Sequence, residues 1–337
     1  MVHAKWTEVA EDASIKRSSQ TLAVLDQDAF IYGGELRPRE PVDSAVHRLS
    51  LKLGDEPHNN FSSFTNLPNT PQPRVGAAST ALDGKIYIFS GRGGVAMAPI
   101  EEHGSLWVFD AKGEWADLKL ADSQAPYPAG RSYHALTNDG KNTIFLHAGC
   151  PENGRLRDLW SFDINTQTWT ELPPAPGSER GGTSIAYSAG KIYRMNGFDG
   201  KTEQGGALDV FDISGNEWST ITYSADGIQG PTPRSVSCLL ALEIVGKPYL
   251  VTMFGEHDPS SLGHQGAGKM LSDVWAFDIQ SSVWTKVVID GEDGNTPPAR
   301  GWFDADVLGT AESSSIVVHG GLAESNDRLG DVWLLKF

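Results

Sequence analysis

The chain carries one short pattern six times, and this repetition constrains its fold more than any other feature. Each copy holds a β-rich run that ends in a pair of residues whose second member is glycine, with an arginine about 15 residues upstream. The pairs are Gly33-Gly34, Ser90-Gly91, Ala148-Gly149, Asn196-Gly197, Phe254-Gly255 and Gly320-Gly321. The arginines are Arg17, Arg74, Arg131, Arg180, Arg234 and Arg300. A repeat of roughly 57 residues is typical of propellers and solenoids, in which each copy is one structural unit.

Each copy reads as four short strands. In four copies a further β-rich run ends in aspartate, and a tryptophan follows five or six residues later. These runs are Leu106–Asp110, Leu159–Asp163, Leu208–Asp212 and Val274–Asp278, followed by Trp115, Trp169, Trp218 and Trp284. The first copy has Val46 and Phe64 in these places. Four strands per copy predict a propeller blade, and we expect the aromatic side chains to fill the core between neighbouring sheets.

The two ends of the chain predict closure of the ring. The sixth copy runs out at Phe337 after three strands, and the opening segment Lys5–Val9 supplies a fourth in which Trp6 takes the place of Trp284. The prediction is therefore an all-β, six-bladed propeller whose last blade is closed by the N-terminal strand. Residues 1–337 are expected to form one domain, with blades near 17–70, 71–128, 129–178, 179–231, 232–297 and 298–337 and a closing strand near 4–10.

Charge and composition exclude several classes of partner. The formal net charge of -16 gives no basic field for nucleic acid. Two cysteines provide neither a disulfide framework nor a four-cysteine zinc site. The chain contains no apolar run that resembles a signal peptide or a membrane span. We expect a soluble, cytoplasmic protein, a monomer or weak homo-oligomer, that binds neither nucleic acid nor membrane.

The residues that follow the six glycines start loops that should meet at one end of the central channel. They are Glu35, Arg92, Cys150, Phe198, Glu256 and Leu322, and a purely structural repeat needs neither the acids nor the arginine there. The fifth copy has the longest of these loops, with Glu256, His257, Asp258 and His264 within nine residues. Carboxylates and imidazoles suit iron, manganese or zinc. A polar surface loop could also carry these residues without a metal.

The arginine, the double glycine and the spaced aromatic residues together resemble the kelch repeat, and the resemblance covers the whole chain. Kelch propellers include protein-binding adaptors as well as enzymes, so the fold does not fix the function. Because the copies run from Lys5 to Phe337, we expect a propeller without an accessory domain.

The layout and the fifth loop resemble the nitrile-specifier, epithiospecifier and thiocyanate-forming proteins of plant glucosinolate breakdown. The resemblance implies Fe(II) and a sulfated aglucone as substrate. The iron motif of that family is Glu, three residues, Asp, three residues, His; Glu256 and His264 match its ends, while Ser260 replaces the aspartate. The implied metal ligands are therefore Glu256, His264 and the nearby Asp258. By position, Arg92 and Arg155 match the arginines that hold the sulfate, and Glu35 completes the expected substrate-binding set.

Three functions follow as hypotheses. The first is a lyase- or isomerase-like specifier for an anionic small molecule, assisted by Fe(II). The second is a kelch module that grips a protein loop without catalysis, and the third is a metal-free accessory for biosynthetic cyclisation. Arg92 and Arg155 would be an anion clamp in the first case, but they could instead form salt bridges with Glu101 or Glu152. Cys150 could be a nucleophile with His134 or His147, although a buried structural cysteine is the simpler interpretation.

Overall fold

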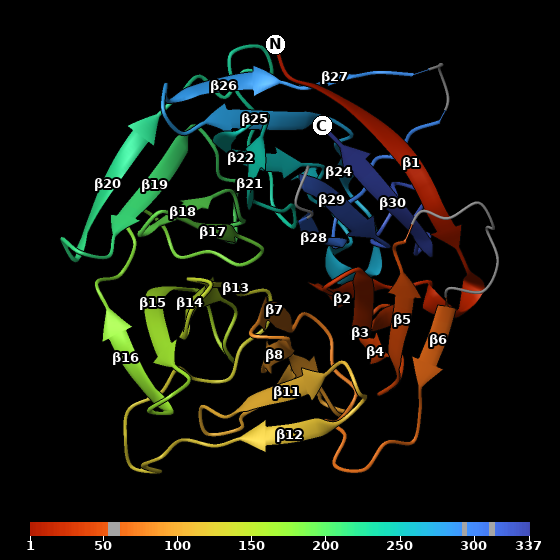
Figure 1. Cartoon of the computed structure of the whole chain (residues 1–337), viewed down its shortest axis with the longest axis vertical. Coiled ribbons are helices and arrows are strands. Elements are labelled where there is room, and N and C mark those ends of the chain that lie inside the picture. Colours follow the sequence, from red (N-terminus) through yellow and green to blue (C-terminus); the bar gives the residue numbers. More distant parts are fainter. Residues whose placement is uncertain (53–60, 292–294, 310–313) are drawn as a thin grey trace.

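The structure of the protein, a computed structural model, describes residues 1–52, 61–291, 295–309 and 314–337; the side chain of His264 lies outside the described part. Six sheets stand around a central axis as the blades of a propeller (Figure 1). The first strand of each blade lies nearest the axis, and later strands lie progressively farther out. This arrangement confirms the predicted all-β, six-bladed fold.

The first three blades follow one another from the N-terminal side. Blade 1 consists of β2 (Ser18–Leu25), β3 (Asp28–Arg37), β5 (Val46–Ser50) and β6 (Phe61–Phe64), with β4 (Glu40–Pro41) paired to β3. Blade 2 consists of β7 (Ala78–Leu82), β8 (Lys85–Phe89), β11 (Leu106–Asp110) and β12 (Trp115–Leu118). Blade 3 consists of β13 (Ala135–Asn138), β14 (Thr143–Gly149), β15 (Leu156–Asp163) and β16 (Thr168–Leu172).

The other three blades complete the ring. Blade 4 consists of β17 (Ser184–Ser188), β18 (Lys191–Met195), β19 (Ala207–Asp212) and β20 (Glu217–Thr222). Blade 5 consists of β21 (Leu240–Ile244), β22 (Lys247–Met253), β25 (Val274–Asp278) and β26 (Val283–Lys286). Blade 6 consists of β28 (Asp304–Gly309), β29 (Ser314–His319), β30 (Asp331–Lys336), β1 (His3–Glu11) and β27 (Val288–Ile289).

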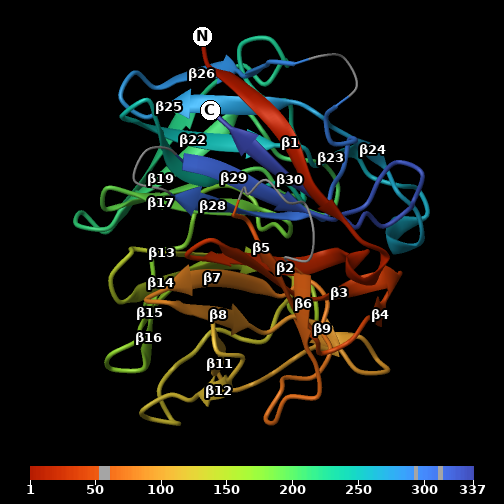
Figure 2. The same ribbon diagram turned by 45° about the vertical axis from the view of Figure 1, so that its right-hand side comes forward.

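The loops between the second and third strands leave the sheets on one side of the ring, which we call the mouth. Figure 2 shows β4, β9, β23 and β24 on this side. In two blades the loop forms a small ribbon: β9 (Arg92–Gly93) with β10 (Ala98–Pro99), and β23 (Glu256–Asp258) with β24 (Lys269–Met270). The described helical turns are 3-10 turns at Ala13–Ile15 and Gly263–Gln265, and neither could cross a membrane.

The N-terminal strand closes blade 6, as predicted. β1 runs antiparallel to β30, with Lys5 opposite Lys336, and pairs in parallel with β27 on its other edge. Trp6 is 3% exposed; its ring centroid lies 5.8 Å from that of Phe254 and 6.4 Å from that of Trp333. Both edges of the strand are thus hydrogen-bonded and its aromatic side chain is part of the core.

The repeated arginines hold the blades together from inside. All six are buried, and each donates from Nη1 to the carbonyl of the residue before the second glycine of its own blade. In blades 3, 5 and 6 the guanidinium also makes two hydrogen bonds to an aspartate that accepts from a tryptophan Nε1. These sets are Arg131–Asp158–Trp160, Arg234–Asp273–Trp275 and Arg300–Asp331–Trp333.

The glycine of each pair is required by the backbone. Both members of every pair have positive φ, and the second is glycine in all six copies, with φ between 89° and 107°. A Cβ on Gly255 would lie 2.7 Å from the carbonyl oxygen of Ser235, too close for any side chain. The glycine pair therefore recurs because all six blades make the same backbone turn at this position.

Two rings of backbone hydrogen bonds join the blades. In the first, the N–H of each second glycine donates to the carbonyl of the repeated arginine of the next blade, at 2.8–3.0 Å. The second ring is formed by the residues two places after each arginine. The N–H of each donates to the carbonyl of the equivalent residue in the preceding blade, at 2.8–3.1 Å. The residues of this backbone ring are Ser19, Gly76, Tyr133, Gly182, Val236 and Trp302.

The hydrophobic core lies between neighbouring blades, as the aromatic pattern predicted. Trp169 of blade 3, for example, packs on Phe162 of its own blade at 4.9 Å and on Phe89 of blade 2 at 5.7 Å between ring centroids. Its Nε1 donates to the carbonyl of Gly104, also in blade 2. Each blade is thus completed by the next, so the ring is stable only as a whole.

Candidate functional site

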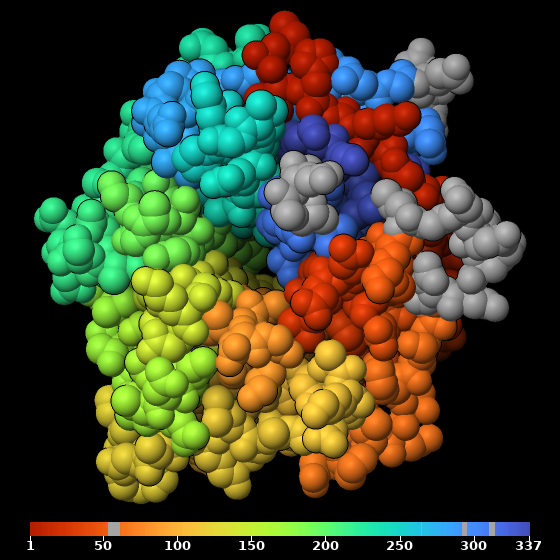
Figure 3. Space-filling view, viewed as in Figure 1, coloured from red at the N-terminus to blue at the C-terminus, as the bar shows by residue number. Residues whose placement is uncertain are grey.

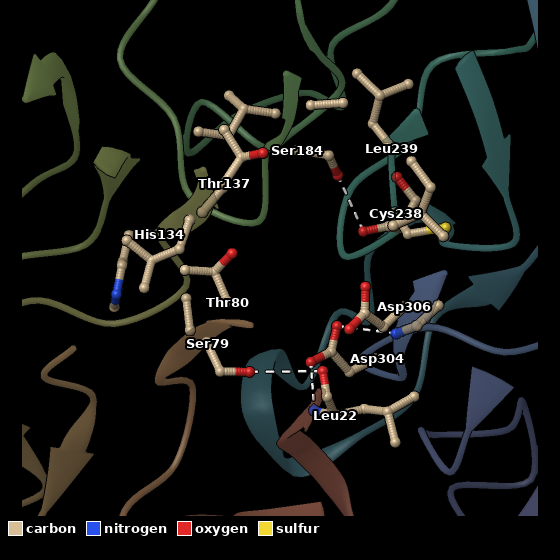
Figure 4. Close-up of a pocket in the computed structure, with 18 of the residues that line it drawn as sticks. Leu22, Ser79, Thr80, His134, Thr137, Ser184, Cys238, Leu239, Asp304 and Asp306 are labelled. Atoms are coloured by element: carbon tan, nitrogen blue, oxygen red, sulfur yellow. Dashed lines mark hydrogen bonds between the residues drawn. The ribbon is translucent and has the colours of Figure 1, made fainter. Parts of the chain in front are cut away.

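The central channel is a cavity of about 350 Å³ lined by the innermost strands of all six blades. The face drawn in Figure 3 is hollowed near the centre of the ring, and Figure 4 shows small polar side chains around the cavity, among them Ser79, Thr80, Thr137 and Ser184. The residues of the backbone ring are also part of its lining. None of the six predicted site residues belongs to this lining as far as the described residues show.

Asp304 and Asp306 are the carboxylates of the channel lining. Asp304 Oδ2 accepts a hydrogen bond from the Leu22 N–H at 2.6 Å, and Asp306 Oδ2 accepts one from the Val24 N–H at 2.8 Å. Burial raises the pKa of Asp304 to about 7 and that of Asp306 to about 6, although these hydrogen bonds lower both. The pair therefore joins the inner strand of blade 6 to that of blade 1.

The residues that follow the six glycines occupy equivalent places at the mouth, and we call them the mouth ring. Each is paired in β-bridge geometry with the residue that follows the repeated arginine of its own blade. The pairs are Glu35 with Ser18, Arg92 with Val75, Cys150 with Ser132, Phe198 with Gly181, Glu256 with Ser235 and Leu322 with Gly301. The six positions therefore lie at equivalent places at one end of the channel, as expected.

Arg92 directs its guanidinium toward blade 3. Its Nε donates to the hydroxyl of Ser132 at 2.8 Å, and its Nη2 donates to the carbonyls of Cys150 and Pro151 at 3.3 and 2.7 Å. Nη1 donates to the carbonyl of Met97 at 3.2 Å. All of these acceptors are neutral, so the positive charge remains uncompensated. The order of the six copies places the second opposite the fifth and so predicts that Arg92 faces Glu256 across the channel; this prediction is wrong, because the guanidinium is held on the loops of blades 2 and 3.

Arg155 stands beside the same part of the mouth. Its guanidinium carbon lies 5.1 Å from the centroid of the Phe198 ring, and its Nη1 would be 2.7 Å from a Cβ on Gly200. Its Nε is buried without a hydrogen-bond partner among the described residues. Arg155 and Arg92 both lower the pKa of the Cys150 thiol, but burial dominates and raises it overall. The two guanidinium groups thus flank Cys150 from either side.

These two arginines differ from five of the six repeat arginines, which pair with a carboxylate; Arg180 is the exception. Neither Arg92 nor Arg155 lies within 4 Å of a carboxylate in the described part of the chain, so the salt bridges with Glu101 or Glu152 that the sequence left open are not formed there. Glu101 instead accepts from the N–H groups of His103 and Gly130. The carboxylate-paired arginines are Arg17, Arg48, Arg74, Arg131, Arg194, Arg234, Arg300 and Arg328.

The cysteine nucleophile is not assembled. Neither His134 nor His147 hydrogen-bonds the Cys150 thiol: the ring of His134 packs edge-on against Phe89, and Nδ1 of His147 bonds the carbonyl of Asp158. Burial lowers the pKa of both imidazoles, so they are neutral. With a raised thiol pKa as well, Cys150 lacks the base that activates a nucleophilic cysteine.

Glu35 is already paired. It lies 9% exposed at the junction between blades 6 and 1, where its Oε1 accepts from Arg328 Nη2 at 3.3 Å and its Oε2 accepts from the Arg39 N–H at 2.6 Å. Burial raises its pKa, and these two contacts lower it. The predicted substrate-binding role of Glu35 therefore competes with an ion pair that the sequence did not reveal.

Glu256 is held inside the fifth loop. Its Oε1 accepts from the Gly268 N–H at 2.9 Å, and a Cβ on Gly268 would overlap that oxygen, so only glycine fits there. Burial raises the pKa of Glu256 to about 7, and the charge of Asp258 adds to the rise. Asp258 itself has a side chain that is 71% exposed, 3.6 Å from Nδ1 of His257.

The predicted metal set is only partly visible. Glu256 and Asp258 lie on the same short strand β23, whereas the side chain of His264 is outside the described part. Among the described residues no group of three histidine, cysteine, aspartate or glutamate side chains is placed to hold a metal ion. A metal here would need His264 or another donor beside the two carboxylates.

Glu203 is a candidate that the sequence argument missed. It is bridged to Phe198, and both of its carboxylate oxygens are buried without a hydrogen bond among the described residues. Burial raises its pKa to about 8, and the charges of Glu256, Asp199 and Asp258 add to the rise. The Ser235 hydroxyl lies near enough to lower this pKa but not in hydrogen-bonding geometry. A signal existed: Glu203 and Arg155 both stand six residues after the second glycine of their repeats.

The fold and the repeated contacts define a six-bladed kelch propeller with a charged mouth. The chain belongs to the KLHDC2/KLHL20/DRC7 Kelch-repeats domain family, which matches residues 19–255. A solved structure of YjhT superposes with a TM-score of 0.70 over 96% of both chains at 17% identity, which shows a shared fold.

Two curated relatives differ in how much of them the chain covers. The N-(sulfonatooxy)prop-2-enimidothioate sulfolyase of Thlaspi arvense is 24% identical over 98% of this chain and 97% of its own length. The Leucine-zipper-like transcriptional regulator 1 homolog of Drosophila melanogaster is 23% identical over 99% of this chain but only 32% of its own length. The chain is thus similar to the whole of one protein and to about a third of the other.

Proposed function

We propose that this protein is a lyase-like specifier for a small substrate that carries an oxyanion such as sulfate together with a sulfur atom, as a glucosinolate aglucone does. The observation that carries the proposal is the pair of guanidinium groups at Arg92 and Arg155, which have no carboxylate partner in the described structure. The relative that matches along its whole length is named for sulfate loss from such a compound.

The roles of the residues follow from their chemistry. Arg155, with no hydrogen-bonded acceptor among the described residues, would hold oxygens of the anion, and Arg92 would add its uncompensated charge. Because sulfate leaves with the electron pair of the bond that breaks, two nearby cations would favour its departure. Phe198 would orient Arg155 and exclude water from one side of the anion.

The metal is part of the same proposal. Glu256, Asp258 and His264 would hold Fe(II) on the opposite side of the mouth. When bound, Fe(II) would supply a Lewis acid with affinity for the substrate sulfur. Glu256 is preorganised for this by the Gly268 N–H, which fixes the carboxylate at the mouth.

A second candidate function is a protein-binding kelch module. It is favoured by the Drosophila relative, in which the matched region is part of a much longer protein. Arg92 also supports it, because its guanidinium already stabilises the loops of blades 2 and 3. In this case the mouth would bind an acidic segment of a partner, and no small molecule would be converted.

One reaction separates the two functions. N-(sulfonatooxy)prop-2-enimidothioate would be generated in anaerobic buffer with Fe(II), with and without the protein, and the organic products and sulfate would be measured. We expect the protein to change the product distribution. Arg155→Ala breaks no described hydrogen bond and should reduce this effect about tenfold or more, because charged hydrogen bonds contribute about 1.5–3 kcal/mol.

Two variants complete the test. Arg92→Ala should weaken the effect by a similar factor, but its melting temperature must be compared with that of the wild type because it also loses contacts to blade 3. Arg157→Ala removes an exposed arginine at the start of β15, two residues after Arg155, and serves as the control that retains full activity. Identical products with and without the wild-type protein would exclude the lyase and favour the binding module.

A further inference from the structure

The repeated arginines of blades 2, 3, 5 and 6 make the same set of contacts. In each, Nε donates to the carbonyl two residues upstream at 2.9–3.2 Å, and Nη1 donates to the carbonyl before the second glycine at 2.8–3.0 Å. These two carbonyls orient the guanidinium so that the edge formed by Nη1 and Nη2 faces a carboxylate. The carboxylates belong to Glu102, Asp158, Asp273 and Asp331, at 2.6–3.1 Å.

Blade 1 keeps a weaker form of this arrangement. Arg17 donates from Nη1 to the carbonyl of Gly33, and its Nη2 lies 2.9 Å from Nε2 of His47. The Asp43 carboxylate lies 3.7 Å from Nη1. Five of the six repeated arginines therefore have a carboxylate within 4 Å.

Arg180 of blade 4 has the two carbonyl contacts without the carboxylate. Its Nε donates to the carbonyl of Ser178 at 3.3 Å and its Nη1 to that of Asn196 at 3.0 Å, so the guanidinium is oriented as in the other blades. Arg180 is 7% exposed, yet its Nη2 donates to no described residue and no described carboxylate lies within 4 Å. The same guanidinium edge thus faces a place that the chain does not fill with an acceptor.

The strand register explains the missing carboxylate. In blades 4 and 5 the third-strand residue opposite the position three before the second glycine is Asp209 and Trp275, respectively. Two residues earlier, blade 5 has Asp273 and blade 4 has Ala207. The methyl group of Ala207 stands where blade 5 has its carboxylate, and it cannot accept a hydrogen bond.

The charges around Arg180 do not cancel. Asp209 pairs with a different arginine: its Oδ2 accepts from Arg194 Nη1 at 2.7 Å, and its Oδ1 accepts from the Thr220 hydroxyl at 2.7 Å. Burial and the charge of Arg194 lower the pKa of Arg180 to about 10, which leaves Arg180 protonated at neutral pH. Two guanidinium groups and one carboxylate leave one positive charge, and a buried charge is costly unless it is paired.

A small ligand can approach the free nitrogen from outside. Gly177 is exposed, and a Cβ on it would lie 3.5 Å from Arg180 Nη2. That Cβ would meet no other described atom within 4 Å apart from its chain neighbours. The free edge of the guanidinium therefore lies close to the surface on the side of Gly177.

From this unfilled place we infer that Arg180 binds the carboxylate of a small free monocarboxylate through Nη1 and Nη2, where the other blades use a side chain of their own. The class of ligand follows from the geometry, because four equivalent guanidinium groups in the same orientation bind a carboxylate. The inference goes beyond the proposed function, since neither Arg92, Arg155 nor the proposed metal ligands take part.

Acetate is the probe, because it reproduces the carboxyl end of an aspartate side chain. The melting temperature of the full-length protein would be measured as acetate replaces chloride at constant ionic strength, since a spherical ion cannot accept two parallel hydrogen bonds. We expect the wild type to melt about 2 °C higher in about 0.1 M acetate. Saturation transfer from the protein to the acetate methyl protons would detect the bound ligand directly by nuclear magnetic resonance.

Ala207→Asp makes the test specific to blade 4 and leaves Arg180, with its carbonyl contacts, in place. The new carboxylate should fill the site, so this variant should melt about 2 °C higher than the wild type without acetate and gain nothing from acetate. Ala207→Asn fills the same space without a charge and should lose the acetate response without gaining stability. Ala116→Asp, the same change at an exposed position of β12, should behave as the wild type does.

Arg155→Ala separates this site from the proposed anion clamp and should keep the acetate response. If Arg155→Ala lost that response while Ala207→Asp kept it, acetate would bind at the clamp and the inference would be overturned, although the proposed function would gain support. A wild type that melts identically in acetate and chloride would also overturn it, and Nη2 would then be hydrated only. If Ala207→Asp alone raised the melting temperature, the place would accept a carboxylate of the chain but no free ligand.

Discussion

The junction between blades 6 and 1 and the junction between blades 4 and 5 use equivalent positions for opposite purposes. At the first, Arg328 pairs with Glu35 at the mouth, and Asp304 and Asp306 bind backbone N–H groups of β2 inside the channel. At the second, Glu203 and Glu256 occupy the corresponding places, and no described cation lies within 4 Å of either carboxylate. Both junctions keep the same backbone hydrogen bonds.

The difference shows which parts of a propeller are free to change. Because the two backbone rings already fix the spacing of the blades, the side chains of the mouth ring and of the residues that face it, such as Arg328, are not needed for it. They can seal a junction, as Arg328 does, or remain uncompensated and available for a ligand. The junction between blades 6 and 1 joins the blade that holds both chain ends, and at its mouth Arg328 and Glu35 form an ion pair.

The largest expected effect concerns this closure. Removing residues 1–10 deletes most of β1, exposes the edges of β27 and β30 and removes the buried Trp6 from between Phe254 and Trp333. Loss of one such aromatic side chain alone costs about 3–5 kcal/mol. We expect a large fall in melting temperature, measured by circular dichroism, whereas a truncation that melted like the wild type would show that β1 does not close the ring.

A smaller effect should distinguish the two junctions directly. Arg328→Met removes one partner of a buried ion pair and leaves Glu35 uncompensated, which should cost about 3 kcal/mol in urea denaturation. Glu203→Gln removes one of two like charges and should leave the metal-free protein equally stable or slightly more stable. Destabilisation of both variants by the same amount would contradict the idea that only one junction is sealed.

The sequence predicted the fold in detail because its physical causes repeat. Six copies of one turn require glycine at the same place, and six buried arginines need the same carbonyl, so the pattern survives even in blade 1, where Val46 and Phe64 take the usual places. The role of Trp6 followed from the missing fourth strand of blade 6. These features are either local in the sequence or repeated along it, so one amino-acid sequence is enough to predict them.

The mouth was harder to predict, since its chemistry lies between blades. Counting residues from the glycines located the mouth ring. It could not predict that Glu35 pairs with Arg328 or that Arg92 donates to backbone carbonyls. Counting from the glycines places Glu203 at the position of Arg155, but it does not place Glu203 near Glu256. That neighbourhood arises only because the ring sets blade 4 beside blade 5.

The smallest expected effect is a dependence of stability on pH that comes from the junction between blades 6 and 1. Asp304 and Asp306 have folded pKa values of about 7 and about 6, above the ordinary value of 3.8, because burial disfavours their charged forms. The folded protein therefore holds these protons more tightly than the unfolded chain. The stability that they contribute is fully present below about pH 4 and is lost as the pH rises through 6 and 7.

Buried histidines act in the opposite sense, and this separates the two effects. Burial lowers the pKa of His319 and His134 to about 3 and that of His47 to about 4, from 6.5, so their contribution is lost only as the pH falls below about 6.5. Above that pH the channel carboxyls should lower the free energy of unfolding by about 1 kcal/mol between pH ~6.5 and ~8, and the raised pKa values of Glu203 and Glu256 should add to this decline. Asp304→Asn keeps an acceptor for the Leu22 N–H but cannot ionise, so its decline measured in urea should be clearly shallower. An equally steep decline in this variant would mean that Asp304 is already charged at neutral pH, and that its hydrogen bond from the Leu22 N–H is enough to stabilise the carboxylate inside the channel.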